Sequence, residues 1–354
     1  MKNLVIGDIH GCYTELLELL DKAGLSAEDQ IIGIGDIVDR GPDSRHVLEF
    51  FNTRANARSI IGNHERKHVR WLRGEVRPAL SQQITRYQLG ERYPEWVTYM
   101  TTFPYFLELP EAILVHGFFE PHVTLRQQKE TVLAGTLSGE YYLKKQYRKP
   151  WYELYPGQKP LIVGHHDYLS TGEPLVYQDR VFCLDTGCCY GGRLTGLILP
   201  DFTLVSVPSR KNYWTEEKTR HVELRIATAR EESLTWKEIE NFLSSAANQS
   251  NMSSAVRERI SRLEALFDEA EDTLAQLFNS IQQENKRVLT QLRSECNFDE
   301  LPVRKQGSIY ATRIGETPLA KFLHLARKGE LTMERLRQCF KRPSDLIAFT
   351  RRIG

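Results

Sequence analysis

The chain has 354 residues, of which 41% are hydrophobic and 26% are charged, and its formal net charge is +1. These values are typical of a globular protein that can bury a sizeable core, and they exclude a disordered or strongly basic chain. No stretch approaches the roughly 18 uninterrupted apolar residues of a transmembrane helix, so no membrane partner is expected. Six cysteines without a CxxC pair favour reduced thiols, and therefore a cytoplasmic protein, over a disulfide framework.

Six apolar, β-branched runs each end in a glycine or in a polar residue that can bind a metal. In chain order they are LVIGD, IIGIGD, ARSIIGNH, AILVHG, PLIVGHH and VFCLDTG. Helical stretches separate several of these runs, which predicts an α/β domain, a layered β-sandwich flanked by helices. Because ligands bind beyond the strand ends of such sheets, we expect the functional site there.

Three short motifs fall within the first 65 residues, and their order and spacing matter more than any one of them. They are GDIHG at 7–11, GDIVDRG at 35–41 and GNHE at 62–65. Each places oxygen or imidazole donors after a predicted strand, and such donors suit hard or borderline divalent metals such as Mn, Fe or Zn. The ligands predicted from these motifs are Asp8, His10, Asp36 and Asn63.

A two-metal centre needs one carboxylate that reaches both ions, which lie about 3.5 to 4 Å apart. Asp36 is the natural bridge. His116 in LVHG and His165 in IVGHH follow later strands and would complete the ligands of the second ion. The sequence therefore predicts two bound divalent cations, with manganese as the first choice and iron or zinc as alternatives.

With GDIHG, GDIVDRG, GNHE, VHG and VGHH in this order, the chain resembles the phosphoprotein phosphatase branch of the calcineurin-like metallophosphoesterases. The resemblance covers roughly residues 1–207. Its last part, LDTGCCYGGRLTGL at 184–197, is similar to the closing strand and turn of bacterial phosphatases and dinucleoside tetraphosphatases. The resemblance implies the metallophosphoesterase fold and two metals, the first held by Asp8, His10 and Asp36 and the second by Asp36, Asn63, His116 and His165.

Further roles follow from the chemistry of the same loops. Two divalent ions lower the pKa of a bridging water, so that the hydroxide attacks phosphorus directly. The leaving alkoxide needs a proton, and His64, next to Asn63, is the candidate general acid. Asp39 would hold the imidazole of His64 in the required tautomer. Arg40 offers a planar fork to the non-bridging phosphate oxygens.

Further substrate contacts are predicted from position alone. The family often has a second glycine after VHG and another phosphate-binding arginine, but Phe118 stands at that glycine's position here. Arg193 and Arg148 are candidates for the missing cation, and Tyr190 is expected to border the site, with a structural role as the alternative. The segment 117–160 is rich in aromatic and basic residues and is either a lid that stacks on a base or a partly buried structural insertion.

The sequence predicts two domains, a catalytic domain at 1–208 and an all-helical accessory region at 209–354. Within the second, apolar residues recur at alternating spacings of four and three from Val256 to Leu292. This heptad pattern predicts one helix of about 40 residues. Its seam packs in an intramolecular bundle, forms a dimerising coiled coil or docks a partner, and the pattern leaves these alternatives open.

The leading functional interpretation is a dimetal phosphomonoesterase, a Ser/Thr-type protein phosphatase that acts on a phosphorylated protein. GDIVDRG together with GNHE matches that branch most closely. The alternative, supported by VGHH and DTGCCYGG, hydrolyses a dinucleoside polyphosphate or acts on a nucleotide-capped or phosphorylated RNA end. A third interpretation, a binding module without activity, is disfavoured because every expected metal position carries a competent ligand.

Overall fold

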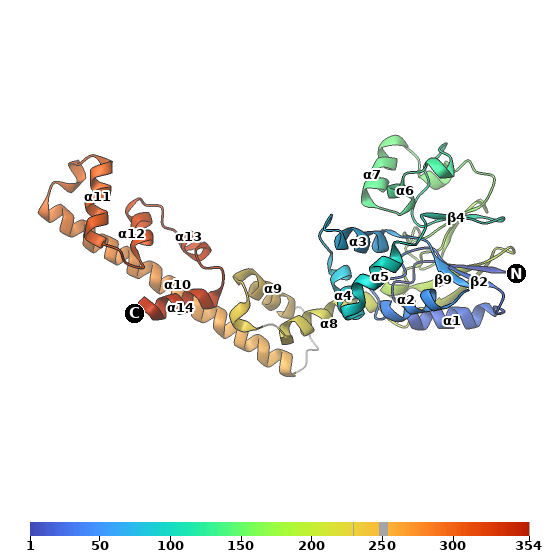
Figure 1. Cartoon of the computed structure of the whole chain (residues 1–354), viewed down its shortest axis with the longest axis horizontal. Coiled ribbons are helices and arrows are strands. Elements are labelled where there is room, and N and C mark those ends of the chain that lie inside the picture. The colour runs from blue at the N-terminus through green and yellow to red at the C-terminus, as the bar shows by residue number, and fades with distance from the viewer. Residues whose placement is uncertain (229, 248–253, 354) are drawn as a thin grey trace. The chain divides into compact units, whose positions relative to one another are not determined.

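The computed structural model describes residues 1–228, 230–247 and 254–353 (Figure 1). The chain forms two compact units, Met1–Arg220 and His221–Gly354. Within the described ranges, no helix combines the length and the apolarity that a membrane crossing requires.

The first unit contains two five-stranded mixed sheets, with the strand orders β10-β9-β1-β2-β3 and β4-β5-β6-β8-β7. Parallel pairing joins β1, β2 and β3 in one sheet and β5, β6 and β8 in the other. These six strands are the six runs predicted from the sequence. The strands are β1 (Asn3–Ile6), β2 (Gln30–Gly33), β3 (Ala57–Ser59), β4 (Phe106–Glu108), β5 (Ile113–Val115), β6 (Leu161–Val163), β7 (Leu175–Tyr177), β8 (Val181–Cys183), β9 (Arg193–Leu199) and β10 (Thr203–Pro208).

Helices follow β1, β2, β3, β5 and β10 and flank the sheets, as expected for the α/β class (Figure 1). The helices that lie in or begin in the first unit are α1 (Tyr13–Ala23), α2 (Ser44–Thr53), α3 (Asn63–Leu72), α4 (Leu80–Leu89), α5 (Tyr93–Met100), α6 (Glu130–Leu133), α7 (Leu137–Gln146) and α8 (Tyr213–Thr228).

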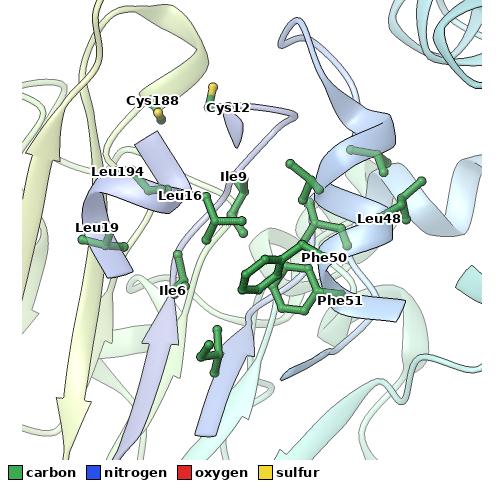
Figure 2. Packing of buried hydrophobic residues seen from close by; sticks show 14 of the residues in the cluster. Ile6, Ile9, Cys12, Leu16, Leu19, Leu48, Phe50, Phe51, Cys188 and Leu194 are labelled. Atoms are coloured by element: carbon green, nitrogen blue, oxygen red, sulfur yellow. The ribbon is translucent and has the colours of Figure 1, made fainter. Parts of the chain in front are cut away.

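Strand β1 contributes to two hydrophobic cores. Val5 belongs to the core between the sheets, together with Ile162 of β6. Leu4 and Ile6 belong instead to the core under α1 and α2, where Ile6 lies near Leu16 (Figure 2). Since successive side chains of a strand point to opposite faces, a strand buried on both sides must be apolar throughout. This double burial holds the parallel strands in the middle of the sandwich and fixes where their ends lie.

The aromatic and basic segment 117–160 is packed onto the second sheet. Trp151 and Tyr155 are 7% and 5% exposed, and they share a core with Val115 and Val163 of β5 and β6. Helices α6 and α7 lie in the same segment. This burial favours the structural insertion over a free lid.

The second unit is built around α10 (Ser254–Glu295), a helix of 42 residues. The heptad seam from Val256 to Leu292 is buried and packs with apolar residues of the other helices of the unit. Because helices of the same chain cover the seam, the structure favours the intramolecular bundle over a dimerising coiled coil. The surrounding helices are α9 (Trp236–Ala247), α11 (Val303–Ile314), α12 (Ala320–Arg327), α13 (Met333–Gln338) and α14 (Pro343–Ile353).

Candidate metal centre

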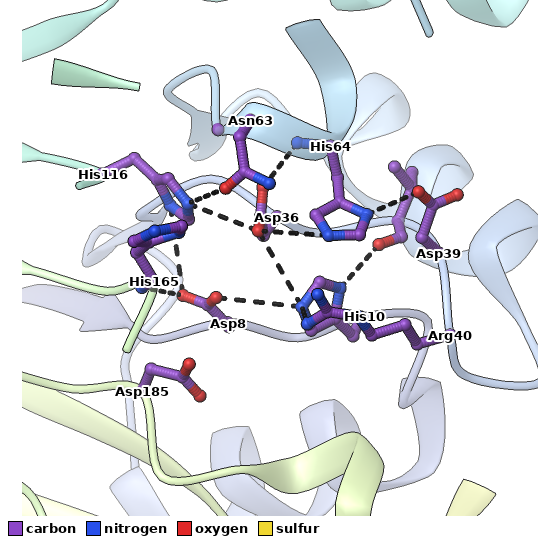
Figure 3. Close-up of polar contacts among 12 residues, drawn as sticks. Asp8, His10, Asp36, Asp39, Arg40, Asn63, His64, His116, His165 and Asp185 are labelled. Atoms are coloured by element: carbon purple, nitrogen blue, oxygen red, sulfur yellow. Dashed lines mark hydrogen bonds and ion pairs between the residues drawn. The ribbon is translucent and has the colours of Figure 1, made fainter. Parts of the chain in front are cut away.

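The polar residues that follow the six parallel strands converge on one pocket (Figure 3). Parallel strands of one sheet end at the same edge, and here the edges of the two sheets meet, so residues far apart in sequence become neighbours. The residues are Asp8 after β1, Asp36 after β2, Asn63 after β3, His116 after β5, His165 after β6 and Asp185 after β8.

Asp36 lies between two groups of donor atoms. Its Oδ2 is 3.8 Å from Nε2 of His10 and 3.3 Å from Nε2 of His116. The donor atoms of His10, Asp36 and His64 lie within 4.8 Å of one another, and so do those of Asp36, His116 and His165. One carboxylate is therefore common to both groups, as the bridging ligand of a two-metal centre must be.

Backbone carbonyls fix the tautomers of two imidazoles. Nδ1 of His10 donates to the carbonyl of Val38 at 2.8 Å, and Nδ1 of His116 donates to the carbonyl of Ile34 at 2.9 Å. The guanidinium of Arg40, which can only donate, lies 2.6 Å from Nε2 of His10, so this nitrogen is an acceptor. A histidine that binds a metal through one nitrogen usually donates a hydrogen bond from the other, and both imidazoles have that arrangement.

Asp8 carries a buried oxygen that suits a cation. Its Oδ1 accepts the backbone N–H of His165 at 2.9 Å, whereas its Oδ2 has no hydrogen-bond partner among the described residues. Burial and then the neighbouring Asp185 carboxylate raise the pKa of Asp8, and burial raises the pKa of Asp185. Buried carboxylates near each other are stabilised by a bound cation, so this donor set fits divalent metals.

Charge compensation in the pocket involves Asp36 and His116. Burial would raise the pKa of Asp36, but His116 and His64 hold it well below its usual range. Burial would lower the pKa of His116, but Asp36 and Asp8 raise it to about 10. The carboxylates thus favour a positive charge at this point, which a dication would supply while leaving the imidazole neutral.

His64 is held by a buried anion. Its Nδ1 lies 2.5 Å from Oδ2 of Asp39, whose Oδ1 accepts from Nε2 of His68 at 2.8 Å. Gln82 donates to the same carboxylate. Burial would raise the pKa of Asp39, but His68 and His64 hold it well below its usual range. Nε2 of His64 lies 3.9 Å from Oδ2 of Asp36, so the free end of the imidazole faces the pocket.

Glu65 joins two of the loops, and sequence reasoning gave it no role. Its carboxylate accepts the backbone N–H groups of Asp36, Ile37 and Gly62, each at 2.9 Å. Its place as the last residue of GNHE was the available signal. Through these three bonds one buried side chain holds the GDIVDRG loop against the GNHE loop.

Two glycines let the carboxylates approach the backbone. A Cβ at Gly62 would lie 2.1 Å from Oδ1 of Asp36, and a Cβ at Gly164 would lie 2.2 Å from Oδ1 of Asp8.

Five non-glycine residues of these loops also have positive φ angles, which cost about 1 to 3 kcal/mol each and tend to cluster at active sites. They are His10, Asp36, Asp39, Arg40 and His165.

A cavity of about 1000 Å³ opens over these groups. Arg40 and Tyr190, both predicted to contact the substrate, line it, with the guanidinium 5.4 Å from the ring centroid. Arg66, Lys67 and Arg70 of α3 line it as well. These three cations were missed, although Arg66 and Lys67 directly follow GNHE. The acidic residues of the lining are Glu140, Asp167 and Asp185, so with dications bound the cavity carries an excess of positive charge and favours a ligand with several negative charges.

The structure does not bring Arg193 into this cavity. Its Nε pairs with Oε1 of Glu173 at 3.4 Å, at a surface where both side chains are about half exposed. Arg148 lines a neighbouring cavity. Asp185, to which the sequence gave no role, does line the first cavity. Its position at the end of the sixth strand was the signal that pointed to it.

Residues 1–194 match the family model described as calcineurin-like phosphoesterase. The chain belongs to this family and is a metal-dependent hydrolase that acts on phosphoesters. The family's fold implies a two-metal site. Two candidate groups of metal-binding residues are present here, and Asp36 belongs to both.

Among curated proteins, a bis(5'-nucleosyl)-tetraphosphatase PrpE [asymmetrical] from Oceanobacillus iheyensis is 31% identical over 246 residues, which cover 62% of this chain and 97% of that protein. The protein of the same name from Bacillus subtilis is 28% identical over 236 residues, covering 59% and 95%. A solved metallophosphoesterase from Sphaerobacter thermophilus is 20% identical with a TM-score of 0.40, covering 74% of this chain and 98% of that one.

Proposed function

We propose that the chain hydrolyses dinucleoside polyphosphates asymmetrically at a two-metal centre. The names of the relatives support this substrate class over the phosphorylated protein that the motifs alone favoured. The observation that carries the hydrolytic activity is the position of Asp36, whose Oδ2 lies 3.8 Å from Nε2 of His10 and 3.3 Å from Nε2 of His116, one histidine of each proposed ligand group.

The donor set divides into two ligand groups that share this carboxylate. When bound, two dications would polarise the phosphoryl oxygens and lower the pKa of the attacking water. Manganese is the first candidate, with iron or zinc as alternatives. The first metal would be held by Asp8, His10 and Asp36, and the second by Asp36, Asn63, His116 and His165.

The residues around these ligands act on the substrate. Arg40 and Lys67 line the cavity and would neutralise the phosphate chain. His64 directs Nε2 at the pocket and would give its proton to the leaving oxygen, while Asp39 holds Nδ1. The water oxygen bonds to an outer phosphorus, and the bond between this phosphorus and the oxygen that links it to the next phosphate breaks. The leaving oxygen keeps the electron pair, so a dinucleoside tetraphosphate yields a nucleoside monophosphate and a triphosphate.

Product analysis tests this proposal. The purified chain is incubated with Mn and with diadenosine tetraphosphate, a phosphopeptide or a 5′-phosphorylated RNA, and the products are separated by ion-exchange chromatography. We expect AMP and ATP from the first substrate. Two molecules of ADP would contradict asymmetric cleavage, and turnover of the phosphopeptide alone would restore the protein phosphatase interpretation.

Metal analysis of the same preparation tests the centre itself. We expect about two equivalents of divalent metal per chain, because the two donor groups share one carboxylate. Less than one equivalent of Mn, Fe or Zn, even after incubation with these metals, would instead support a binding module without activity.

A further inference from the structure

A second cavity adjoins the one over the candidate metal ligands. Its volume is about 500 Å³, and Glu140 and His166 line both cavities. Small-molecule sites typically enclose about 300 to 1,000 Å³. The second cavity is therefore large enough for a ligand of that kind, and hydrolysis at the metal centre does not by itself require it.

Aromatic side chains form the wall of the second cavity. The rings of Trp151, Tyr152, Tyr168 and His166 follow one another in edge contacts, with centroids 5.9, 5.4 and 5.4 Å apart. Nε1 of Trp151 donates to the hydroxyl of Tyr168 at 3.2 Å. These mutual contacts set the ring positions before a ligand binds, which lowers the entropy that binding must offset.

The aromatic wall reaches the candidate metal centre. The ring of Phe118 lies 6.4 Å from that of Trp151 and 5.1 Å from that of His165. On the other side, the rings of His165 and His166 stack at 5.2 Å. A candidate ligand of the second metal thus contacts two residues of the second cavity, so one extended ligand can occupy both cavities.

Cations surround the aromatic wall. Lys144, Arg148 and Lys149 line the cavity and are exposed. The acidic residue of the lining is Glu140, whose carboxylate already pairs with Nζ of Lys144 at 2.6 Å. Rings beside an excess of positive charge are the combination that holds a stacked base and the phosphate attached to it.

We infer that the second cavity binds one nucleoside of a dinucleoside polyphosphate, while the phosphate chain crosses the first cavity. This inference rests on the proposed function. A nucleoside held in one place fixes which phosphorus reaches the candidate metal ligands. The position of the second cavity therefore selects an outer bridging bond over the central one, and with it the asymmetric products.

Matched variants of α7 test the nucleoside site in the full chain. Lys144→Glu places a second carboxylate beside Glu140, whereas Lys145→Glu makes the same change at the next exposed position, which is not part of the cavity lining. Tyr152→Ala removes part of the aromatic wall. For each variant, kcat and KM are measured with diadenosine tetraphosphate and with p-nitrophenyl phosphate, which carries no nucleoside.

Lys144→Glu and Tyr152→Ala are expected to lower kcat/KM for diadenosine tetraphosphate roughly tenfold or more, mainly through KM, as expected for losing a stacked base. Turnover of p-nitrophenyl phosphate stays at the wild-type value, and Lys145→Glu changes neither substrate. If Tyr152→Ala fails to fold, Lys144→Glu and Arg148→Glu, both at exposed positions, decide the question.

The two proposals fail in different ways. A wild-type chain that does not hydrolyse diadenosine tetraphosphate overturns the proposed function and the nucleoside site with it. A wild-type chain that hydrolyses it, with Lys144→Glu affecting both substrates equally or neither, overturns the nucleoside site alone. Lys144→Glu lowering the turnover of a phosphopeptide but not of diadenosine tetraphosphate would assign the cavity to a peptide side chain instead.

Discussion

The two units of the chain bury different kinds of residue. In Met1–Arg220 the pocket at the strand ends buries carboxylates such as Asp36 and Glu65, and all described non-glycine residues with positive φ lie in this unit. In the described part of His221–Gly354, Asn285 is the single buried polar residue, and it accepts a hydrogen bond from Tyr310 at 2.7 Å. The first unit therefore holds charge and strain that a ligand can compensate, whereas the second is stabilised by ordinary apolar packing.

The largest effect on activity is expected for Asp36→Asn, which keeps the shape of the shared ligand but removes its charge. Metal content should fall by one or two equivalents, and turnover by roughly 10³-fold or more, because the metals contribute several kcal/mol to the transition state. Elemental analysis and p-nitrophenyl phosphate hydrolysis measure the two effects. Asp201→Asn, the same change at an exposed position, is the control. Full metal content in Asp36→Asn would contradict the bridging role.

His64→Ala should affect chemistry more than metal content. An alkyl phosphate, whose leaving alkoxide needs a proton, should be hydrolysed roughly 10² to 10⁴-fold more slowly. The loss should be smaller for p-nitrophenyl phosphate, because nitrophenolate leaves without a proton. The two leaving groups are compared on one preparation with its metal content measured. An equal loss for both would remove His64 as the general acid.

Sequence patterns could predict the position of this pocket, because each of the six parallel strands is followed by a polar residue that lines it or binds there. The same patterns do not show which distant side chains support it. Gln82 reaches Asp39 from α4, and His68 reaches the same carboxylate from α3. These contacts depend on how helices pack onto the sheet, which local spacing does not encode. Strands β4 and β7, the antiparallel edge strands of the second sheet, were not among the six predicted runs.

Substrate contacts were harder to predict than the pocket, for a related reason. Arg193 was predicted without a motif to support it, and in the structure it pairs with Glu173 at the surface. Arg66 and Lys67 lie in a helical stretch where exposed cations are common, and only the packing of α3 directs them to the cavity. Side chains anchored at strand ends are therefore easier to place than long side chains whose direction depends on packing.

Glu65→Gln tests whether the buried charge of the first unit serves to position ligands. The amide cannot replace a carboxylate that accepts three backbone N–H groups, so the GDIVDRG and GNHE loops should separate. Metal affinity and turnover should each fall roughly 10 to 100-fold, as for residues that orient metal ligands. Metal titration measures the affinity, with Glu95→Gln at an exposed position as the control. Unchanged metal affinity would show that Glu65 serves only the fold.

The smallest effect on activity is expected in the second unit, where the largest effect on stability should occur. Leu274 is 1% exposed on the seam of α10, so Leu274→Ala should destabilise the helical bundle by about 2 to 5 kcal/mol. Because the described part of that unit holds none of the candidate ligands, hydrolysis of p-nitrophenyl phosphate below the unfolding temperature should match that of the wild type.

Calorimetry and turnover of Leu274→Ala, measured on the same sample, therefore separate the two units. Val303→Ala removes an apolar side chain that is 75% exposed and should leave both measurements unchanged. A fall in turnover of Leu274→Ala while the first unit remains folded would contradict the independence of the two units. It would mean that the metal centre depends on the packing of the helical unit.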